Sequence, residues 1–169
     1  MMPSLLSPAQ LLGYLALVLG VGCFLQTDDR RFKQFMAVEC LAYVLHFWLL
    51  GQPTAVASSL VSLGRSVAAM YSRSRWLAAL FVGLNLALGW WLFSGAVSLL
   101  PIAASCLGSL ALFLLQGLQM RLLMLAGTLC WVVHNALVGS VGGTLLELVV
   151  AGVNGLTIWR LWRAGRAGP

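Results

Sequence analysis

Long apolar runs separated by short polar turns are the feature that most constrains how this chain can fold. Only 8% of its 169 residues are charged, whereas a soluble domain carries about 25%, so the chain cannot cover its surface in water. In the alternative solvent, the lipid bilayer, backbone polar groups must be satisfied within helices or a closed barrel. The runs lack the alternation of a membrane barrel. The sequence therefore predicts an all-α membrane protein, with the lipid bilayer as a partner.

Seven of these runs have the length of membrane-crossing helices, for which about 20 residues span about 30 Å of hydrocarbon. The first ten residues carry no Lys or Arg, so we expect no cleaved signal peptide. Pro53 is well placed to open the third helix, and the glycine-rich stretch 139–143 predicts a tight turn before the last. The expected helices cover residues 10–26, 34–50, 54–71, 76–93, 98–116, 122–138 and 144–162.

Basic residues follow the first, third, fifth and seventh expected helices, and the turns after the other three contain none. With seven crossings, all of these charges share one face of the membrane, which the positive-inside rule makes cytoplasmic. We therefore expect a periplasmic N-terminus and a cytoplasmic C-terminus with a basic tail at 163–169. The residues concerned are Arg30, Arg31, Lys33, Arg73, Arg75, Arg121, Arg160, Arg163 and Arg166.

A constant offset of 88 residues relates the two halves of the chain. It places Tyr43 on Trp131 and His46 on His134, each in an aromatic-x-x-His context. Such an offset predicts two copies of one unit, a first repeat at 10–72 and a second at 98–162, joined by a linker helix at 76–93. Because the linker adds one crossing, the two triplets run in the same direction, and a pseudo-two-fold axis along the membrane normal relates them. The offset also pairs Gly20 with Gly108, Lys33 with Arg121, Gly51 with Gly139 and Gly64 with Gly152.

Two resemblances follow from these patterns. The 3+1+3 arrangement resembles the SWEET transporters and their PQ-loop relatives in topology alone, because the Pro-Gln signature is absent and Pro101 precedes Ile102. Over nearly the whole chain the sequence is more similar to the YgjV type of bacterial inner-membrane protein, which implies that location and fold. The motifs that carry this resemblance are Asp29–Lys33, His46-Phe47, Leu50-Gly51, Ser72–Trp76, Leu99–Pro101, Met120-Arg121, Cys130–Asn135, Gly139–Thr144, Glu147 and Asn154.

Five ionisable residues fall within expected helices: Glu39, His46, Arg65, His134 and Glu147. A charge in mid-bilayer costs about 2.5–3.5 kcal/mol on insertion scales, so each should face a partner or a cavity. Glu39 and Arg65 lie at similar depth, which favours a structural ion pair between them. His134 and Glu147 lie on either side of the glycine-rich turn and could meet across it.

The functional interpretation places these side chains around a solute cavity. His46 and His134 would flank it, and His titrates near neutral pH, so proton coupling is chemically available. Arg65 could hold an anionic group bidentately. In SWEET-like proteins the third helix of each triplet supplies polar contacts, which the positions of Ser66 and Asn154 resemble. The structural alternative is that these residues form interhelical hydrogen bonds and small-residue packing. The expected substrate-binding set is Arg65, His46, His134, Asn154, Glu147, Ser66 and Trp131.

Other functions find little support in the sequence. The four cysteines lie in apolar runs without a Cys-x-x-Cys pair, so we expect no metal site. No catalytic constellation or cofactor motif is evident, and the net charge of +6 is better explained by membrane orientation than by nucleic acid. We therefore predict a carrier of a small polar or anionic solute. The alternatives are a non-transporting partner-binding or regulatory subunit and a membrane enzyme using His134 and Glu147. The oligomeric state stays open, a homo-oligomer included.

Overall fold

The computed structural model describes residues 6–24, 29–72, 74–115 and 117–166, and within them the chain forms seven α-helices and one short 3₁₀ turn. No strand occurs in these ranges, so the all-α prediction is confirmed. The elements are α1 Pro8–Phe24, α2 Asp29–Leu49, α3 Pro53–Ala68, α4 Arg75–Trp91, η1 Ala96–Ser98, α5 Leu99–Leu114, α6 Gly117–Leu137 and α7 Val141–Arg166.

Three helices extend further than their apolar runs predict. α2 begins at Asp29 and not at residue 34, and α6 begins at Gly117 and not at residue 122. Arg, Lys and Gln are good helix formers, so a helix continues past the point where hydropathy falls. α7 begins at Val141, which places Gly142 and Gly143 in its first turn and limits the turn before it to a few residues.

Local sequence signals explain the helix ends. Pro53 occupies the first turn of α3, as expected, because its missing N–H group would have had no helical partner there. The Ser74 hydroxyl accepts a hydrogen bond of 3.2 Å from the Trp76 N–H group and caps α4. Gly51 and Gly139, 88 positions apart, both have positive φ, at 67° and 75°. Glycine adopts this conformation without steric cost, so both chain reversals are equivalent in backbone geometry.

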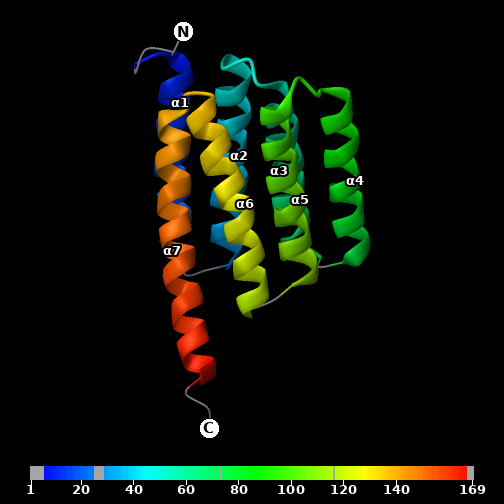
Figure 1. The fold of residues 1–169 in the computed structure, drawn as a ribbon, viewed down its shortest axis with the longest axis vertical. Coiled ribbons are helices and arrows are strands. Elements are labelled where there is room, and N and C mark those ends of the chain that lie inside the picture. Colours follow the sequence, from blue (N-terminus) through cyan, green and yellow to red (C-terminus); the bar gives the residue numbers. More distant parts are fainter. Residues whose placement is uncertain (1–5, 25–28, 73, 116, 167–169) are drawn as a thin grey trace.

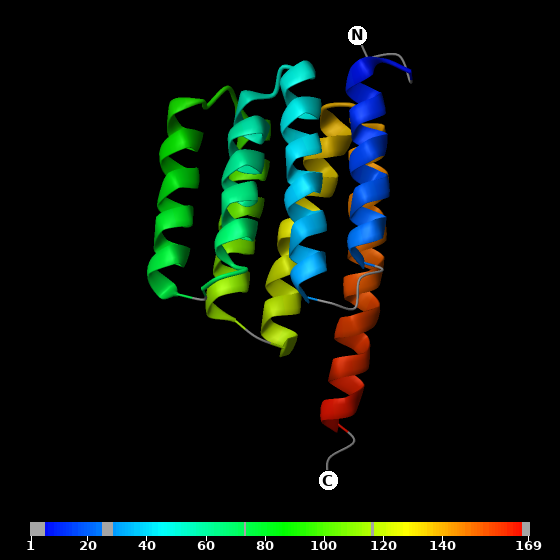
Figure 2. The same cartoon turned by 180° about the vertical axis from the view of Figure 1, so that it is seen from behind.

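The seven helices form two layers (Figures 1 and 2). α1, α2 and α3 make one layer, α7, α6 and α5 make the other, and α4 lies at one edge against α3 and α5. Two seams join the layers at their sides, α1 against α7 and α3 against α5. α2 and α6 lie between the seams and meet through their aromatic side chains.

The described helices suit a membrane. Three segments are long and apolar enough to cross a bilayer, Ala96–Leu114, Leu118–Leu137 and Val141–Arg163, and shorter apolar helices cover Pro8–Gly22 and Gln34–Leu49. Large apolar side chains are exposed on the outside of the bundle, including Trp90 at 88% and Leu156 at 59%, as lipid-facing surfaces require.

The described basic residues near helix ends gather at one end of the bundle. Arg75 begins α4, Arg121 lies in the first turns of α6, and Arg160 and Arg163 lie on the end of α7 that projects beyond the other helices (Figure 1). The side chains of Arg30, Arg31, Lys33, Arg73 and Arg166 lie outside the described residues. We call this the basic end of the bundle and the opposite one the neutral end.

Candidate functional site

An aromatic stack joins α2 to α6 in the centre of the bundle. The Phe47 ring stacks on Trp131 with centroids 5.5 Å apart, and Tyr43 stacks on Phe47 at 5.3 Å and on Trp131 at 6.4 Å. Phe47 is fully buried. Trp131 belongs to the expected substrate-binding set, and here the partners of its ring are the protein's own side chains.

His46 lies beside this stack on α2, is fully buried, and has a partner for each ring nitrogen. Its Nδ1 is 2.6 Å from the Ala9 carbonyl oxygen in α1. Its Nε2 is 2.7 Å from the Ser140 hydroxyl, in the turn before α7. Since Nδ1 must donate to the carbonyl, a neutral His46 accepts from Ser140 at Nε2. His46 therefore ties α2 to both helices of the α1/α7 seam.

His134 is also fully buried, on α6, but neither of its ring nitrogens has a hydrogen-bond partner. Its ring packs edge-on against Phe47 at 5.5 Å and Trp131 at 5.7 Å. The backbone of Val97 lies close to the His134 ring, but no hydrogen bond joins the two. The adjacent Asn135 is fully buried as well, and neither atom of its amide has a partner. Buried polar groups usually have hydrogen-bond partners, so His134 and Asn135 are exceptions whose side-chain donors and acceptors are unused.

The 88-residue offset relates the surroundings of the two histidines. Val97, near His134, is the counterpart of Ala9, which binds His46, and Gln52 is the counterpart of Ser140. Around His46 the seam is closed further by Gln10, whose side-chain nitrogen donates to the Gly139 carbonyl at 2.6 Å. The Gln10 side-chain oxygen accepts from the Val141 N–H group at 3.2 Å.

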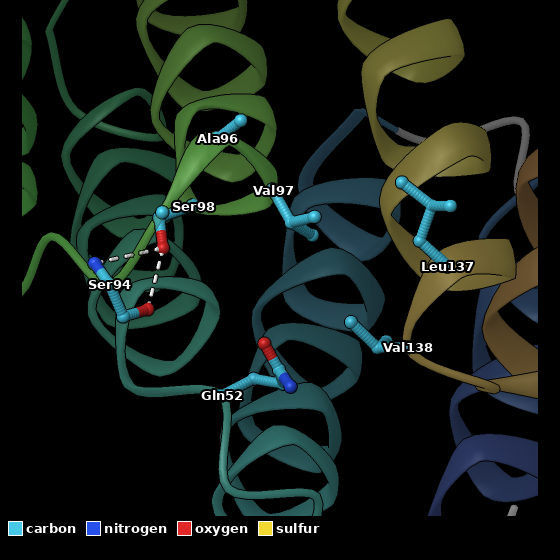
Figure 3. A pocket seen from close by; sticks show the side chains of 8 residues that line it. Gln52, Ser94, Ala96, Val97, Ser98, Leu137 and Val138 are labelled. Atoms are coloured by element: carbon cyan, nitrogen blue, oxygen red, sulfur yellow. Dashed lines mark hydrogen bonds between the residues drawn. The ribbon is translucent and has the colours of Figure 1, made fainter.

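The corresponding place near His134 holds a pocket of about 320 Å³ at the neutral end of the bundle (Figure 3). Residues from both layers and from the α4–α5 connection line it. Leu137 and Val138 follow His134 at i+3 and i+4, so all three share one face of the chain around the end of α6. Figure 3 shows the Ser98 hydroxyl bonded to Ser94 beside the pocket, at 2.8 Å to the Ser94 hydroxyl. The lining includes Gln52, Ser94, Val97, Ser98, Leu137 and Val138.

Arg65 lies in the α3/α5 seam, in the last turn of α3. Its Nη1 donates to the Ser105 carbonyl at 3.1 Å, and its Nε has no partner. The hydroxyls of Ser62 and Ser105 are 3.2 Å apart one turn away. The guanidinium thus donates this hydrogen bond to α5 and not to Glu39. The Glu39–Arg65 ion pair stays a prediction.

The remaining expected residues are Asn154, Ser66 and Glu147, and each has a different environment. The Asn154 side-chain oxygen accepts from Arg121 Nη1 at 3.2 Å, which links α7 to α6. Ser66 is buried and donates to the Ser62 carbonyl at 2.8 Å, within α3. Glu147, on α7, interacts electrostatically with Tyr43 and Glu39 of α2.

The structure thus brings His46, His134 and Trp131 together around Phe47, and it separates them from Arg65 and Ser66 in the α3/α5 seam. Sequence reasoning missed three groups of residues that complete these environments. Tyr43 was identified as a repeat position and not as a polar group. The hydrogen-bonding partners Gln10, Ser140 and Ser105, and the pocket residue Gln52, gave no signal beyond being polar residues near helix ends or among small residues.

Comparison with known proteins places the chain among bacterial membrane proteins. Residues 7–165 match a sequence family described as bacterial inner membrane protein, Imp-YgjV. The chain is 38% identical over 160 residues to the inner membrane protein YgjV of Escherichia coli K12, an alignment that covers 95% of this chain and 87% of that protein. No solved structure matches it.

Proposed function

The chain belongs to the YgjV family of bacterial inner membrane proteins, and on this premise we propose that it is a carrier of a small polar or anionic solute. All seven helices cross the membrane in this proposal, with the neutral end periplasmic and the basic end cytoplasmic. The two helix triplets work as a SWEET-like pair that rocks about the bundle centre to give alternating access.

The observation that carries the proposal is the pocket beside an unsatisfied histidine. Its volume of about 320 Å³ is at the lower end of the range for small-molecule sites, about 300–1,000 Å³. Below it, His134 and Asn135 are buried with unused donors and acceptors. A polar solute that reached them would replace its lost water contacts with hydrogen bonds, which an apolar solute could not do.

The packing order of the helices supports the paired triplets. Rotating the first triplet onto the second exchanges α1 with α5, α2 with α6 and α3 with α7, so the α1/α7 seam becomes the α5/α3 seam. Both seams are present. His46 and His134 both lie toward the neutral end, so in this proposal the pocket beside His134 is the entrance on that face, and the contact at His46 stays closed.

Arg65 gives the preference for anionic solutes. It is a part-buried guanidinium in the α3/α5 seam with an unpartnered Nε and a hydrogen bond to a backbone carbonyl. A carboxylate or phosphate would form a bidentate contact with such a group. The hydroxyls of Ser62 and Ser105 lie one turn from Arg65 in the same seam and add polar groups beside it.

Transport assays test the proposal directly. Protein reconstituted into liposomes is screened for counterflow with labelled sugars, amino acids and small carboxylates. We expect flux of one class, lost in Arg65→Ala and retained in Arg75→Ala, whose side chain is exposed at the start of α4. Absence of both flux and binding across the panel contradicts the carrier and leaves the partner-binding alternative.

Orientation has its own experiment. Alkaline phosphatase fused to the C-terminus is active only in the periplasm, and a fluorescent-protein fusion folds in the cytoplasm. The proposed topology predicts fluorescence and no phosphatase activity. Phosphatase activity at the C-terminus would reverse the proposed positions of the neutral and basic ends.

A further inference from the structure

Two carboxyl groups face the same tyrosine between α2 and α7. Glu39 and Tyr43 are one turn apart on one face of α2. Tyr43 packs in the same buried cluster as Leu146 of α7, and Glu147 is the next residue along that helix. This packing brings carboxyl groups from two helices toward one phenol ring. Glu147 is the seventh of the 26 residues of α7, so the cluster lies about two turns from the start of that helix.

The Tyr43 hydroxyl is the polar centre of this cluster. Its side chain is 8% exposed, and its hydroxyl has no hydrogen-bond partner. It lies within electrostatic range of both Glu147 and Glu39, and the two carboxyl groups are within range of each other. An unsatisfied buried hydroxyl beside two carboxyl groups is a donor ready for a carboxylate oxygen.

The surrounding charges leave the two carboxyl groups uncompensated. Burial acts on both carboxyl groups, Glu39 adds to its effect at Glu147, and no cation contributes to either. On α2, Cys40 is adjacent to Glu39, and both ring nitrogens of His46 are hydrogen-bonded, to Ala9 and to Ser140. Across the interface, Arg121 of α6 donates to Asn154, two turns along α7 from Glu147. Arg65 of α3 interacts with Cys40 and Cys106 and binds Ser105.

We propose that Glu39, Tyr43 and Glu147 form an intramembrane proton-binding site. Two like charges near each other in an apolar medium do not both ionise readily, so the pair retains one proton. The Tyr43 hydroxyl, which has no partner in this structure, is the donor available to the carboxylate that ionises. Intramembrane acids of this kind mark proton pathways.

The site exchanges its proton with the basic end of the bundle. In that direction Asn154 and Arg121 supply polar groups two turns away on α7 and α6. In the other direction the stack of Tyr43, Phe47 and Trp131 separates the site from His134 and the pocket. This proposal does not depend on the protein being a carrier. If it is one, the site would couple solute movement to a proton.

Labelling with dicyclohexylcarbodiimide provides the test, because this lipid-soluble reagent modifies protonated carboxyl groups within membranes. Purified wild-type protein in liposomes is treated at neutral pH, and the modified residue is mapped by peptide mass spectrometry. We expect modification at Glu39 or Glu147 that decreases severalfold as the pH is raised by two units. Absence of modification at both glutamates overturns the proposal, and this measurement needs no variant.

Variants distinguish a shared proton from two independent acids. In Glu147→Gln, labelling of Glu39 at neutral pH should fall severalfold because the neighbouring negative charge is gone, and Glu39→Gln should act on Glu147 in the same way. Tyr43→Phe should change the labelling of both, whereas Tyr14→Phe in α1 should change neither. Labelling that is insensitive to replacement of the partner glutamate contradicts the shared site. Size-exclusion profiles identify any variant that fails to fold.

Discussion

His46 and His134 occupy equivalent positions in the sequence and opposite situations in the structure. Both are fully buried beside Phe47. His46 has a partner at 2.6 Å and another at 2.7 Å, whereas His134 has none. The difference does not lie in the histidines but in what surrounds them. His46 ties helices together, whereas His134 packs against Phe47 and Trp131 with both ring nitrogens unpaired.

Side-chain length and bulk at the seams explain why the surroundings of the two histidines differ. Ser140 places its hydroxyl directly on His46, while the residue 88 positions earlier is the longer Gln52, which lines the pocket. Gly142 lets α7 approach the α1 backbone at Gly13 and Tyr14, and its counterpart in α3 is Thr54. A Cβ atom at Gly142 would collide with the Gly13 backbone, so only the α1/α7 seam can close this tightly.

The largest expected effect comes from replacing each histidine with leucine, which has a similar volume. His46→Leu removes two hydrogen bonds and leaves the Ser140 hydroxyl unpaired, so we expect a loss of about 2–4 kcal/mol in unfolding free energy. His134→Leu removes a polar group without partners from apolar surroundings and should change stability by less than about 1 kcal/mol. Unfolding in mixed micelles with increasing SDS measures both. Equal losses would contradict the distinction between tie and free side chain.

The next effect concerns the seams. Gly142→Ala forces α1 and α7 apart, and overpacking of this kind typically costs about 1–3 kcal/mol. Thr54→Ala, the counterpart in the α3/α5 half, deletes a small side chain whose hydroxyl has no partner, with an expected cost below about 1 kcal/mol. The same micelle unfolding assay compares them. A Gly142→Ala protein as stable as wild type would show that the sealed seam is not closely packed.

A smaller effect is expected from Ser140, which bonds to His46, and from Gln52, which lines the pocket. Ser140→Ala leaves His46 Nε2 without a partner and should cost about 1 kcal/mol. Gln52→Ala removes a pocket-lining side chain for which a cost within about 0.5 kcal/mol is expected. Gln52→Ala should instead alter solute binding, measured as thermal stabilisation by the solute found in the flux screen. If Gln52→Ala destabilises the protein more than Ser140→Ala does, Gln52 belongs to a structural network and not to an open site.

Much of the fold was predictable because hydropathy and charge are local signals. The positions of all seven helices follow from apolar runs and from breakers such as Pro53, and the errors occur where polar residues continue a helix, as at Asp29 and Gly117. The order of the helices in two layers is a different matter. It depends on which faces pack, and a nearly all-apolar helix shows no preferred face in its sequence.

The site was predictable in its residues and not in their partners. The 88-residue offset singled out both histidines and Trp131. The second hydrogen bond of His46 depends on Ser140, which is distant in sequence but has its hydroxyl 2.7 Å from His46 Nε2. The expected ion pair of Arg65 with Glu39 stays a prediction, and the hydrogen bond that Arg65 donates to the Ser105 carbonyl was not expected. Every residue has a backbone carbonyl acceptor, so no sequence pattern indicates which carbonyl Arg65 binds.

The smallest expected difference between the two halves of the chain is how readily water reaches positions that are 88 residues apart. In a cysteine-free background, Val138→Cys places a thiol in the pocket lining, and Leu50→Cys places one at the position 88 residues earlier. Leu50 and Val138 both pack against the buried cluster that contains Tyr43 and Phe47, but of the two only Val138 also lines the pocket. A thiol facing water ionises and reacts with a maleimide more readily than one in apolar packing. We therefore expect Val138→Cys to react severalfold faster with a membrane-impermeant maleimide.

The side of addition sharpens this result. Reagent added to intact spheroplasts reaches both cysteines only if the neutral end is periplasmic, so labelling by external reagent also tests the orientation. A solute that occupies the pocket should slow the reaction of Val138→Cys and leave that of Leu50→Cys unchanged. Equal rates at the two positions, with or without solute, would mean that both seams are closed at the neutral end. The difference between His46 and His134 would then be one of hydrogen bonding alone, without an opening to the outside.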